Sequence, residues 1–369
     1  MSDYTSTGTP VVMPTNISDL RIDPTGIARV SVEHVERLAR HSLKSGDIVY
    51  SRRGDVEKCA LIRDEEVGWL CGTGCLLVRV GGEQVDARFL CYSLSQPETR
   101  AWITGRAVGA TTPNLNTGIL REVPVLLPPI DEQRGIAATL GAIDDKIESN
   151  CRAQNLVLDT AEAAYVEACF KGSQLTALKD VGRWLSGGTP STTNSNYWGG
   201  TLPWVSAASL KSLYIRKSDR NLTLIGADAA TNIVPAGTVI FVVRGMSLKS
   251  EFRFGLTQRE VTFGQDCKAI IPRICPAVLA IALRARTAAI LELVDEAGHG
   301  TGRLATDLLE QLPIEIPTDP AFASVAQSLL ARGASAAEEN DRLIALRDTL
   351  LPELLSGRIR VPECKDDAA

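Results

Sequence analysis

The stretch Gly46-Asp47-Ile48-Val49-Tyr50-Ser51-Arg52-Arg53-Gly54 returns later in the chain as Gly237-Thr238-Val239-Ile240-Phe241-Val242-Val243-Arg244-Gly245. Each copy has a glycine, a run rich in β-branched and aromatic residues, and an arginine before a second glycine. A short apolar run bounded by glycines is typical of a buried strand between turns. The two copies therefore predict the same strand and turn at two places in the fold.

Two further blocks repeat in the same order. Residues 115–120 and 123–128 return as 304–309 and 312–317, and residues 10–12 (PVV) return as 203–205 (PWV). Chance similarity between short apolar strands is the alternative explanation, but the shared order of three blocks argues against it. The sequence therefore indicates an internal duplication with a period near 190 residues.

Each repeat has a β-rich part followed by a long helix. Strands are expected at 47–50, 75–80, 239–243 and 269–271, where β-branched residues alternate with Gly and Pro punctuation. The predicted fold class is α/β (α+β). Two mixed, β-rich globular domains, 1–128 and 173–317, are joined by two spacer helices. The first helix is expected at 129–172, and residues 318–369 hold the second helix and a tail. The helices are expected to pack as a coiled-coil-like pair with a pseudo-two-fold internal repeat.

Each helix shows a seam, which in the first helix advances in steps of three and four residues. The first seam is at 136, 140, 143, 147, 150, 154, 157, 161, 164 and 168, and the second at 325, 329, 336, 340, 343, 346, 350 and 354. Asn150 and Asn340 fall at matching places, and a polar seam residue fixes the register of a helix pair at some cost in stability. The helices are expected to pack on each other, antiparallel or crossed. The alternative is that each packs only on its own domain.

Composition limits the class of protein. The chain has 369 residues, 44% of them hydrophobic, and no apolar run near the length that spans a bilayer. No signal peptide is evident, and the nine cysteines are an odd number, so free thiols and a cytoplasmic location are expected. The net charge of −5 hides a segregation: residues 172–317 carry 15 basic and 12 acidic side chains, while both helical segments are acidic. Because charges act locally, this total does not exclude a nucleic acid partner.

Catalytic signatures are missing. The sequence contains no phosphate-binding glycine loop, no nucleophile elbow and no metalloprotease motif. Three histidines are too few and too scattered for a metal site, and Cys71 and Cys75 have the wrong spacing for a zinc knuckle. The chain is expected to be non-catalytic, without a metal or a cofactor of its own.

Several segments together resemble the specificity subunit of type I restriction–modification systems. Residues 127–134 (LPPIDEQR) resemble the family's junction between strand and spacer helix. Residues 187–192 (GGTPST), followed by 197–200 (YWGG) and 203–205, resemble the opening of a target-recognition domain. Residues 346–357 resemble its C-terminal helix. The likeness covers nearly the whole chain in the family's order.

One departure concerns the first domain. Residues 175–200 have no counterpart before Pro10, so the first domain is expected to be shortened at its start, without the Gly-Gly-Thr-Pro loop and the strand before it. Either residues 8–10 are a remnant of that loop, or a neighbouring segment such as 358–361 completes the sheet.

The resemblance implies a non-catalytic reader of double-stranded DNA. It implies a bipartite target, two DNA-methylation subunits as partners, and restriction or translocase subunits in complexes that also cut DNA. S-adenosylmethionine would belong to the methylation subunits, and the role would be defence against phage. The alternative, supported by the acidic net charge, is a scaffold whose duplicated domains bind protein and do not read DNA.

DNA readout needs forked or amide side chains at base edges and cations at phosphates. Arg244, Lys249 and Arg253 follow the second repeated strand, as Arg52, Arg53 and Lys58 follow the first. Loops rich in hydroxyl and amide groups complete the candidate set. The full set is Arg52, Arg53, Lys58, Thr111, Thr112, Asn114, Thr189, Ser191, Thr192, Asn194, Tyr197, Lys211, Arg244, Lys249, Arg253 and Arg303. Lys211 opens a basic run with Arg216, Lys217 and Arg220. Each position has an ordinary alternative as a polar turn or a solvated face.

Overall fold

The repeated sequence forms the central strand of a sheet at both places. Strand β6 (Ile48–Ser51) lies between β7 (Cys59–Leu61) and β9 (Cys75–Val78), and β15 (Val239–Val242) lies between β17 (Phe254–Thr257) and β19 (Cys267–Pro272). All four pairings are antiparallel. The computed structural model describes residues 4–108, 113–297 and 301–361. The predicted strands thus coincide with β6, β9, β15 and β19.

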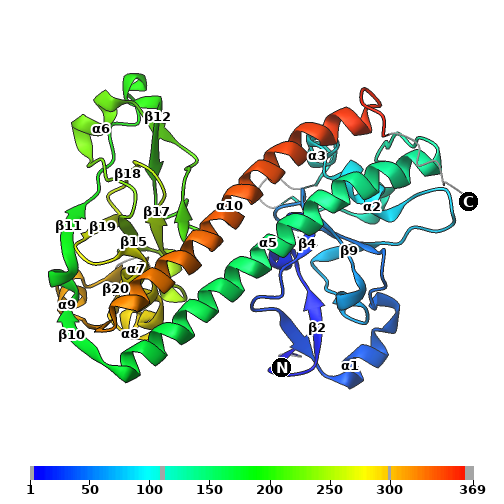
Figure 1. The fold of residues 1–369 in the computed structure, drawn as a ribbon. Coiled ribbons are helices and arrows are strands. Elements are labelled where there is room, and N and C mark those ends of the chain that lie inside the picture. The colour runs from blue at the N-terminus through cyan, green and yellow to red at the C-terminus, as the bar shows by residue number, and fades with distance from the viewer. Residues whose placement is uncertain (1–3, 109–112, 298–300, 362–369) are drawn as a thin grey trace, which may run out of the picture. The chain divides into compact units, whose positions relative to one another are not determined.

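The chain divides into two units that are discontinuous in sequence. The first comprises the described residues of Met1–Ile147 and Arg342–Ala369, and the second comprises Glu148–Asp341. Helices α5 (Ile130–Lys171) and α10 (Pro320–Leu355) each contribute one part to each unit. The β-rich part of each unit is called its head below: residues 4–129 form the first head, and residues 172–319 form the second (Figure 1).

The first head contains a four-stranded sheet in the order β1-β5-β2-β8, the sheet β7-β6-β9, and the hairpin β3-β4. Its other strands are β1 (Tyr4–Thr5), β2 (Thr9–Val12), β3 (Ile17–Ser18), β4 (Arg21–Ile22), β5 (Ala28–Val30) and β8 (Leu70–Cys71). Its helices are α1 (Val32–Arg37), α2 (Ala87–Leu94), α3 (Pro97–Thr104) and α4 (Thr117–Arg121).

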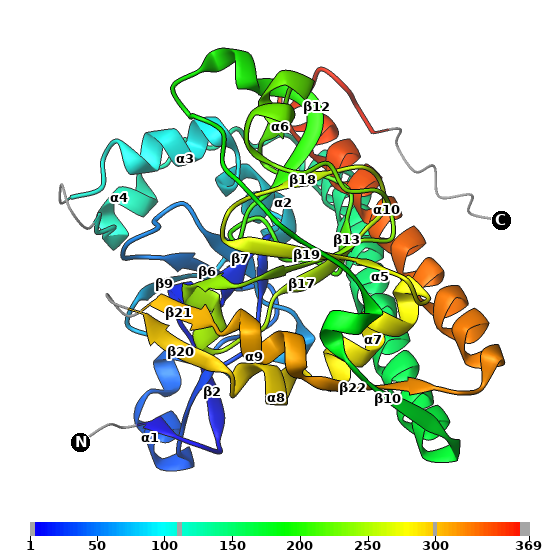
Figure 2. The same ribbon diagram turned by 90° about the vertical axis from the view of Figure 1, so that its left-hand side faces the viewer.

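The second head contains the sheets β11-β19-β15-β17-β13, β14-β12-β18, β16-β21-β20 and β10-β22. Its other strands are β10 (Ser173–Ala177), β11 (Gly182–Ser186), β12 (Trp198–Val205), β13 (Tyr214–Ile215), β14 (Asn221–Leu222), β16 (Arg244–Gly245), β18 (Thr262–Phe263), β20 (Val294–Ala297), β21 (Thr301–Leu304) and β22 (Pro313–Pro317). Its helices are α6 (Leu224–Ala230), α7 (Pro276–Ala285), α8 (Thr287–Leu291) and α9 (Thr306–Gln311) (Figure 2).

The duplication extends to strand register. Val11 of β2 pairs in parallel with Leu70 of β8, and Trp204 of β12 pairs in parallel with Thr262 of β18. Pro10 therefore takes the strand position of Pro203, so residues 9 and 10 belong to this strand and not to a remnant loop. Residues 358–361 lie in no strand. Neither explanation offered for the shortened first head is seen in the described residues.

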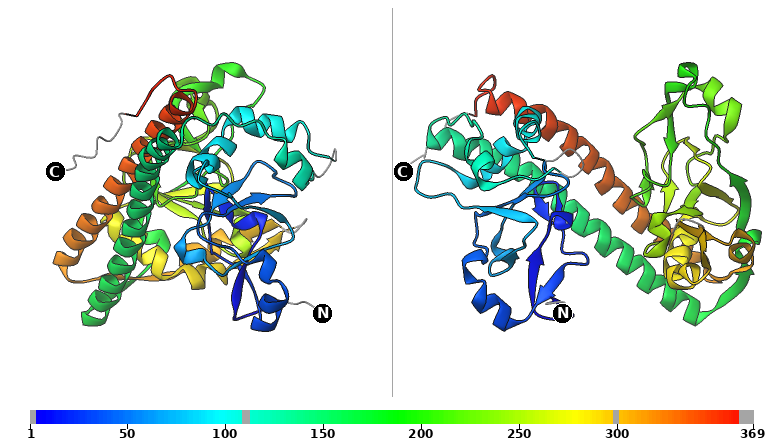
Figure 3. Two further views of the ribbon diagram at one scale, coloured as in Figure 1. Left: turned by 90° about the vertical axis from the view of Figure 1, so that its right-hand side faces the viewer. Right: turned by 180° about the vertical axis from the view of Figure 1, so that it is seen from behind.

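The helix stretches within each unit run antiparallel and share that unit's core. In the first unit, Ile136 and Leu140 of α5 pack with Leu354 of α10 and with Phe89 of α2. Figures 1 and 3 show this part of α5 and of α10 beside the first head. In the second unit, Tyr165 of α5 joins α10 residues in the large core beneath β15. The helices therefore pack on each other and also on the heads.

The seam of α5 is as predicted, and that of α10 is as predicted only in part. Val325 and Leu346, two assigned seam positions, are each 47% exposed. The buried line runs instead through Phe322, Ala326, Leu330, Gly333, Ala337, Asn340, Arg347 and Leu354, of which Ala337 and Arg347 are only partly exposed. Gly333 explains the error, because a glycine carries no apolar signal. A Cβ built on it would overlap the Tyr214 hydroxyl, so the tyrosine side chain occupies that seam position.

Two chemical features complete the description. The eight described cysteines are all free thiols, and the ninth, Cys364, lies outside the described residues. Among the described helices, none is both long and apolar enough to cross a membrane.

Candidate nucleic-acid interface

In the first head, the turn after β6 lies against the segment that leads into α4. Arg53 forms an antiparallel bridge with Asn114. The amide of Leu115 donates to the Arg52 carbonyl over 2.8 Å, and the amide of Gly54 donates to the Pro113 carbonyl over 3.1 Å. The backbone thus brings together two predicted residues, Arg53 and Asn114, that are far apart in sequence.

The second head repeats this arrangement at the matching residues. Arg244 of β16 pairs with Arg303 of β21, and Gly245 pairs with Gly302. The amide of Leu304 donates to the Val243 carbonyl over 2.9 Å, as Leu115 does to Arg52 in the first head. Figure 2 shows β20 and β21 extending from this edge of the head. Both heads therefore hold a cation beside a side chain able to read a base edge.

A hollow in the second head lies beside this pair. Arg244, Lys268 and Arg303 supply three cations to it. Gln265 adds an amide, and Asp307 and Glu310 of α9 add carboxylates on one side. Arg244 and Arg303 are exposed, while Lys268 on β19 is half-buried. The arrangement presents guanidinium and amide groups to a partner rich in acceptors, which is what base edges and phosphates offer.

At the corresponding place in the first head, two buried polar atoms lack a hydrogen-bond partner among the described residues. They are the Nε of Arg52 and the Oδ1 of Asn114. An unsatisfied buried polar group costs about 1–3 kcal/mol. A ligand group that reached either atom would recover part of that cost.

Other predicted cations lie elsewhere. Lys58 is exposed and pairs with Asp55 over 3.3 Å, and Lys249 is exposed in the turn after β16. Arg253 pairs with Glu251 over 2.7 Å. Together with Lys211 it lines a different hollow, which also includes residues of α5 and α10. Arg253 and Lys211 are therefore not gathered with Arg244 and Arg303.

The basic run after Lys211 is partly engaged by α10. Arg216 pairs with Glu338 over 3.0 Å, and Lys217 pairs with Asp341 over 2.7 Å. These contacts tie the second head to its helix stretch. Arg220 instead stacks its guanidinium 3.4 Å from the centre of the Trp198 ring, a cation–π contact that leaves it at the surface.

In the loop at residues 189–197 of the second head, many polar groups hydrogen-bond to other groups of the same segment. Asn194 accepts from the Asn196 amide, Ser191 bonds to Thr193, and the Trp198 indole donates to the Ser191 carbonyl. Ser191 and Thr192 are exposed, while Thr189, Asn194 and Tyr197 are half-buried. The predicted residues Thr111 and Thr112 of the first head lie outside the described residues.

Two residues of the second head's hollow were not predicted. Lys268 and Gln265 sit on and before β19, within a run whose other signals are those of a buried strand. The position that matches Lys268 in the first head is Leu76, so the repeat gave no signal for it. The cationic character of this hollow is therefore particular to the second head.

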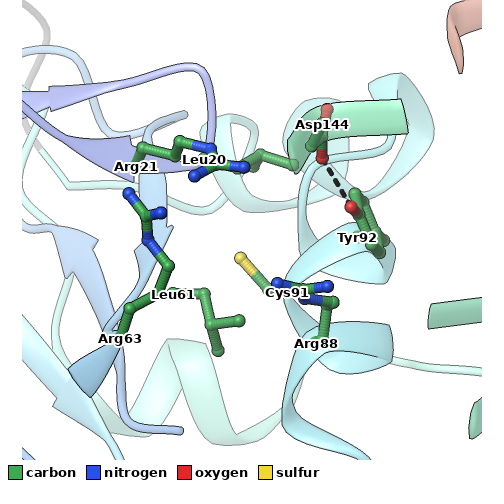
Figure 4. Close-up of a pocket in the computed structure, with 8 residues that line it drawn as sticks. All are labelled: Leu20, Arg21, Leu61, Arg63, Arg88, Cys91, Tyr92 and Asp144. Carbon is green, nitrogen blue, oxygen red and sulfur yellow. Dashed lines mark hydrogen bonds between the residues drawn. The ribbon is translucent and has the colours of Figure 1, made fainter. Parts of the chain in front are cut away.

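A polar junction joins α5 to the first head and is structural in character. Asp144 of α5 accepts a hydrogen bond from the Tyr92 hydroxyl (Figure 4). It also accepts one from Arg347 of α10, over 3.0 Å. Burial, and then the charge of Asp144, raise the pKa of Tyr92 above its usual value, so the phenol keeps its proton. The adjoining cavity, lined also by Arg21, Arg63 and Arg88, holds only about 30 Å³, roughly one water.

Comparisons with known proteins agree with this architecture. Residues 4–158 match the model of the type I restriction modification DNA specificity domain. The EcoR124I/EcoR124II specificity subunit of Escherichia coli is 31% identical over 97 residues, which are 26% of this chain and 24% of that protein. The HindI specificity subunit of Haemophilus influenzae is 25% identical over 198 residues, 51% of this chain and 42% of that protein. The matches thus span less than half the length of these relatives.

The fold is also seen in a solved structure. The S subunit of the type I restriction–modification system of M. genitalium superposes with a TM-score of 0.52 at 16% identity, covering 95% of this chain and 93% of that one. The class defined by fold and site is thus a duplicated α/β protein with two heads and long spacer helices. The match of residues 4–158 to this domain model, together with the similarity to the HindI specificity subunit, confirms the resemblance of this chain to type I specificity subunits.

Proposed function

We propose that this chain is the sequence-reading subunit of a type I restriction–modification complex, with no catalytic activity of its own. Each head reads one half of a bipartite target in double-stranded DNA, through Arg53 and Asn114 in the first and Arg244 and Arg303 in the second. The observation that carries the proposal is the recurrence of this cross-strand pair at matching repeat positions.

The residue types at these positions suit direct readout. An asparagine amide forms a bidentate pair with adenine, and an arginine forms one with guanine O6 and N7 in the major groove. The helices α5 and α10, which contribute to both units, set the gap between half-sites. Their exposed acidic faces repel phosphates and remain available to two methylation subunits, which bind S-adenosylmethionine, and to restriction subunits where these are present.

Methylation mapping tests the proposal. The chain is co-expressed with its cognate methylation subunit, and methylated adenines are mapped in host DNA. We expect a bipartite motif that disappears when this chain is deleted. An assembled complex that methylates no defined motif would instead favour a protein-binding scaffold.

Single substitutions show which head reads which half-site. Arg303→Ala should relax one half-site and leave the other intact, and Asn114→Ala should relax the opposite half. Each bidentate pair that is removed corresponds to about 1–3 kcal/mol of discrimination. Uniform weakening on all sequences would mean that the replaced side chain contacts phosphate and not a base edge.

A further inference from the structure

The two heads differ at one edge of the repeated sheet. In the second head, β11 pairs antiparallel with the outer edge of β19, from Gly182 opposite Pro272 to Ser186 opposite Lys268. In the first head, β9 has β6 on one side, and no described strand pairs with its other edge. An exposed strand edge offers a row of backbone donors and acceptors to another strand.

An apolar groove lies beside this open edge. It is formed by β9, α2, α4 and the segment after α4, and its apolar lining includes Leu77, Leu90, Leu120, Val123 and Val125. All five side chains are only partly buried. Apolar surface left in water in this way is stabilised by any partner that covers it, at about 25 cal/mol per Å².

The duplication shows what covers the same surface in the second head. The repeat counterparts of Leu90, Leu120 and Val125 are Leu279, Leu309 and Ile314, and each of these is 0% exposed. The segment of η4 (Leu178–Val181) and β11 closes this region. The Leu178 amide donates to the Leu312 carbonyl over 3.0 Å, and Leu178 and Val181 belong to the same buried core.

Trp184 of β11 completes the cover. Its ring packs edge-on against Phe241 of β15, with centroids 5.5 Å apart, and its indole nitrogen donates to the Leu178 carbonyl over 3.3 Å. The covering segment is thus a turn followed by a strand, with apolar side chains at 178, 181 and 184.

We propose that the open edge of β9 and the groove beside it form a docking site for one extended peptide segment from a partner polypeptide. The segment adds a strand to β9, as β11 does to β19, and inserts apolar side chains spaced like Leu178, Val181 and Trp184. Backbone hydrogen bonds supply affinity, and the groove supplies specificity. The site is separate from the Arg53–Asn114 pair, and the proposal does not rest on DNA reading.

Peptide binding to the full chain tests the site. The probe is a fluorescein-labelled peptide with the sequence of residues 177–187 (ALKDVGRWLSG), with a scrambled peptide of the same composition as reference. We expect saturable binding by fluorescence anisotropy, weakened at least tenfold by Leu120→Lys. The matched control is Leu126→Lys, because Leu126 is 73% exposed and lies outside the groove. It should bind as the unsubstituted chain does, and thermal melts confirm that both variants are folded.

A fusion keeps the test decisive if the free peptide binds too weakly to measure. Residues 177–197 are joined ahead of residue 4 through a Gly/Ser linker, which raises the local concentration to the millimolar range. Hydrogen exchange in β9 should then slow at least tenfold. Binding unaffected by Leu120→Lys, or β9 exchange unchanged in the fusion, overturns the proposal. So does binding seen only after residues 362–369 are deleted, because the chain's own tail would then be the occupant.

Discussion

Asn150 and Asn340 hydrogen-bond to each other across the helix pair of the second unit, with Nδ2 of Asn150 donating to Oδ1 of Asn340 over 2.9 Å. The two residues are 5% and 7% exposed. They occupy matching positions of the duplicated sequence, and Asn150 also donates to Glu339 over 2.8 Å. A buried amide pair of this kind specifies which turns of the two helices face each other.

Replacing one member of this pair should cost more than replacing both. Asn340→Leu leaves the Asn150 amide without this partner, and we expect a loss of about 1–3 kcal/mol in the free energy of unfolding. The double variant with Leu at both positions should recover most of that loss, because two apolar residues then meet. Urea denaturation of the four proteins in the cycle gives the coupling. Strictly additive losses would contradict a direct pair.

Breaking the ion pair between Asp144 and Arg347 by removing one partner should strongly destabilise the first unit. Their side chains are 10% and 16% exposed, and Asp144 also accepts from Tyr92. Arg347→Met strands a buried carboxylate, which typically costs about 3–5 kcal/mol. The control is Arg152→Met, which removes a pair with Glu148 from a side chain that is 68% exposed and should cost under about 1 kcal/mol. Equal losses in thermal or urea unfolding would be evidence against the buried pair.

Replacing a cation of the second head's hollow should weaken DNA binding more than replacing a cation that is paired with α10. Arg244→Ala and Lys268→Ala should each weaken binding to duplex DNA and lower the slope of log affinity against log salt by about one unit for each phosphate that is no longer neutralised. Arg216→Ala is the matched control, since Arg216 is paired with Glu338 and Asp341. A larger effect from Arg216 than from Arg244 would instead place the DNA beside α10, where Arg216 pairs with Glu338.

Gly333 should not tolerate a side chain, although helices normally favour alanine over glycine. The Cβ of Gly333→Ala would overlap the Tyr214 hydroxyl. We expect a net loss of about 1–3 kcal/mol from overpacking, in place of a gain of about 1 kcal/mol from helix propensity. Adding Tyr214→Phe should recover part of the loss. Stabilisation by Gly333→Ala alone, in urea unfolding, would show that the ring moves aside freely.

Alkaline pH should destabilise the second unit through Tyr214. Burial raises the pKa of this phenol to about 12, while in the unfolded chain the pKa is about 10. Between these values the unfolded chain loses the proton and the folded chain keeps it, so stability falls as pH rises from about 10 to about 12. Tyr214→Phe removes a buried hydroxyl that has no partner among the described residues. It should be at least as stable at pH 7 and lose less stability above pH 10 in thermal melts.

Much of the fold was predictable because the duplication shows each local signal twice. The strands at β6 and β15 follow from one glycine-bounded pattern, and the placement of Asn150 against Asn340 follows from matching seams. Part of the α10 seam was misassigned because Gly333 gives no apolar signal, while its partner Tyr214 is distant in sequence.

The candidate site was less accessible to sequence reasoning. The pairing of Arg244 with Arg303 depends on β16 and β21, strands too short to leave a periodic signal. Arg253 resembles Arg244 in sequence context, yet its side chain pairs with Glu251 and lines the hollow that also contains Lys211. Lys268 lies on a strand whose repeat counterpart is apolar. In each case tertiary neighbours decide what the cation faces.

The discontinuity of the first unit has a consequence for synthesis on the ribosome. Residues 148–341 form one uninterrupted stretch, so the second unit has all its parts once its own residues have emerged. The first unit is translated earlier, but it waits for α10 residues such as Leu354, which packs with Phe89 and Ile136. Its core stays incomplete while some two hundred further residues are translated, and exposed apolar surface at that stage invites aggregation or chaperone binding. A premature stop near residue 342 would therefore damage the part of the protein that was made first.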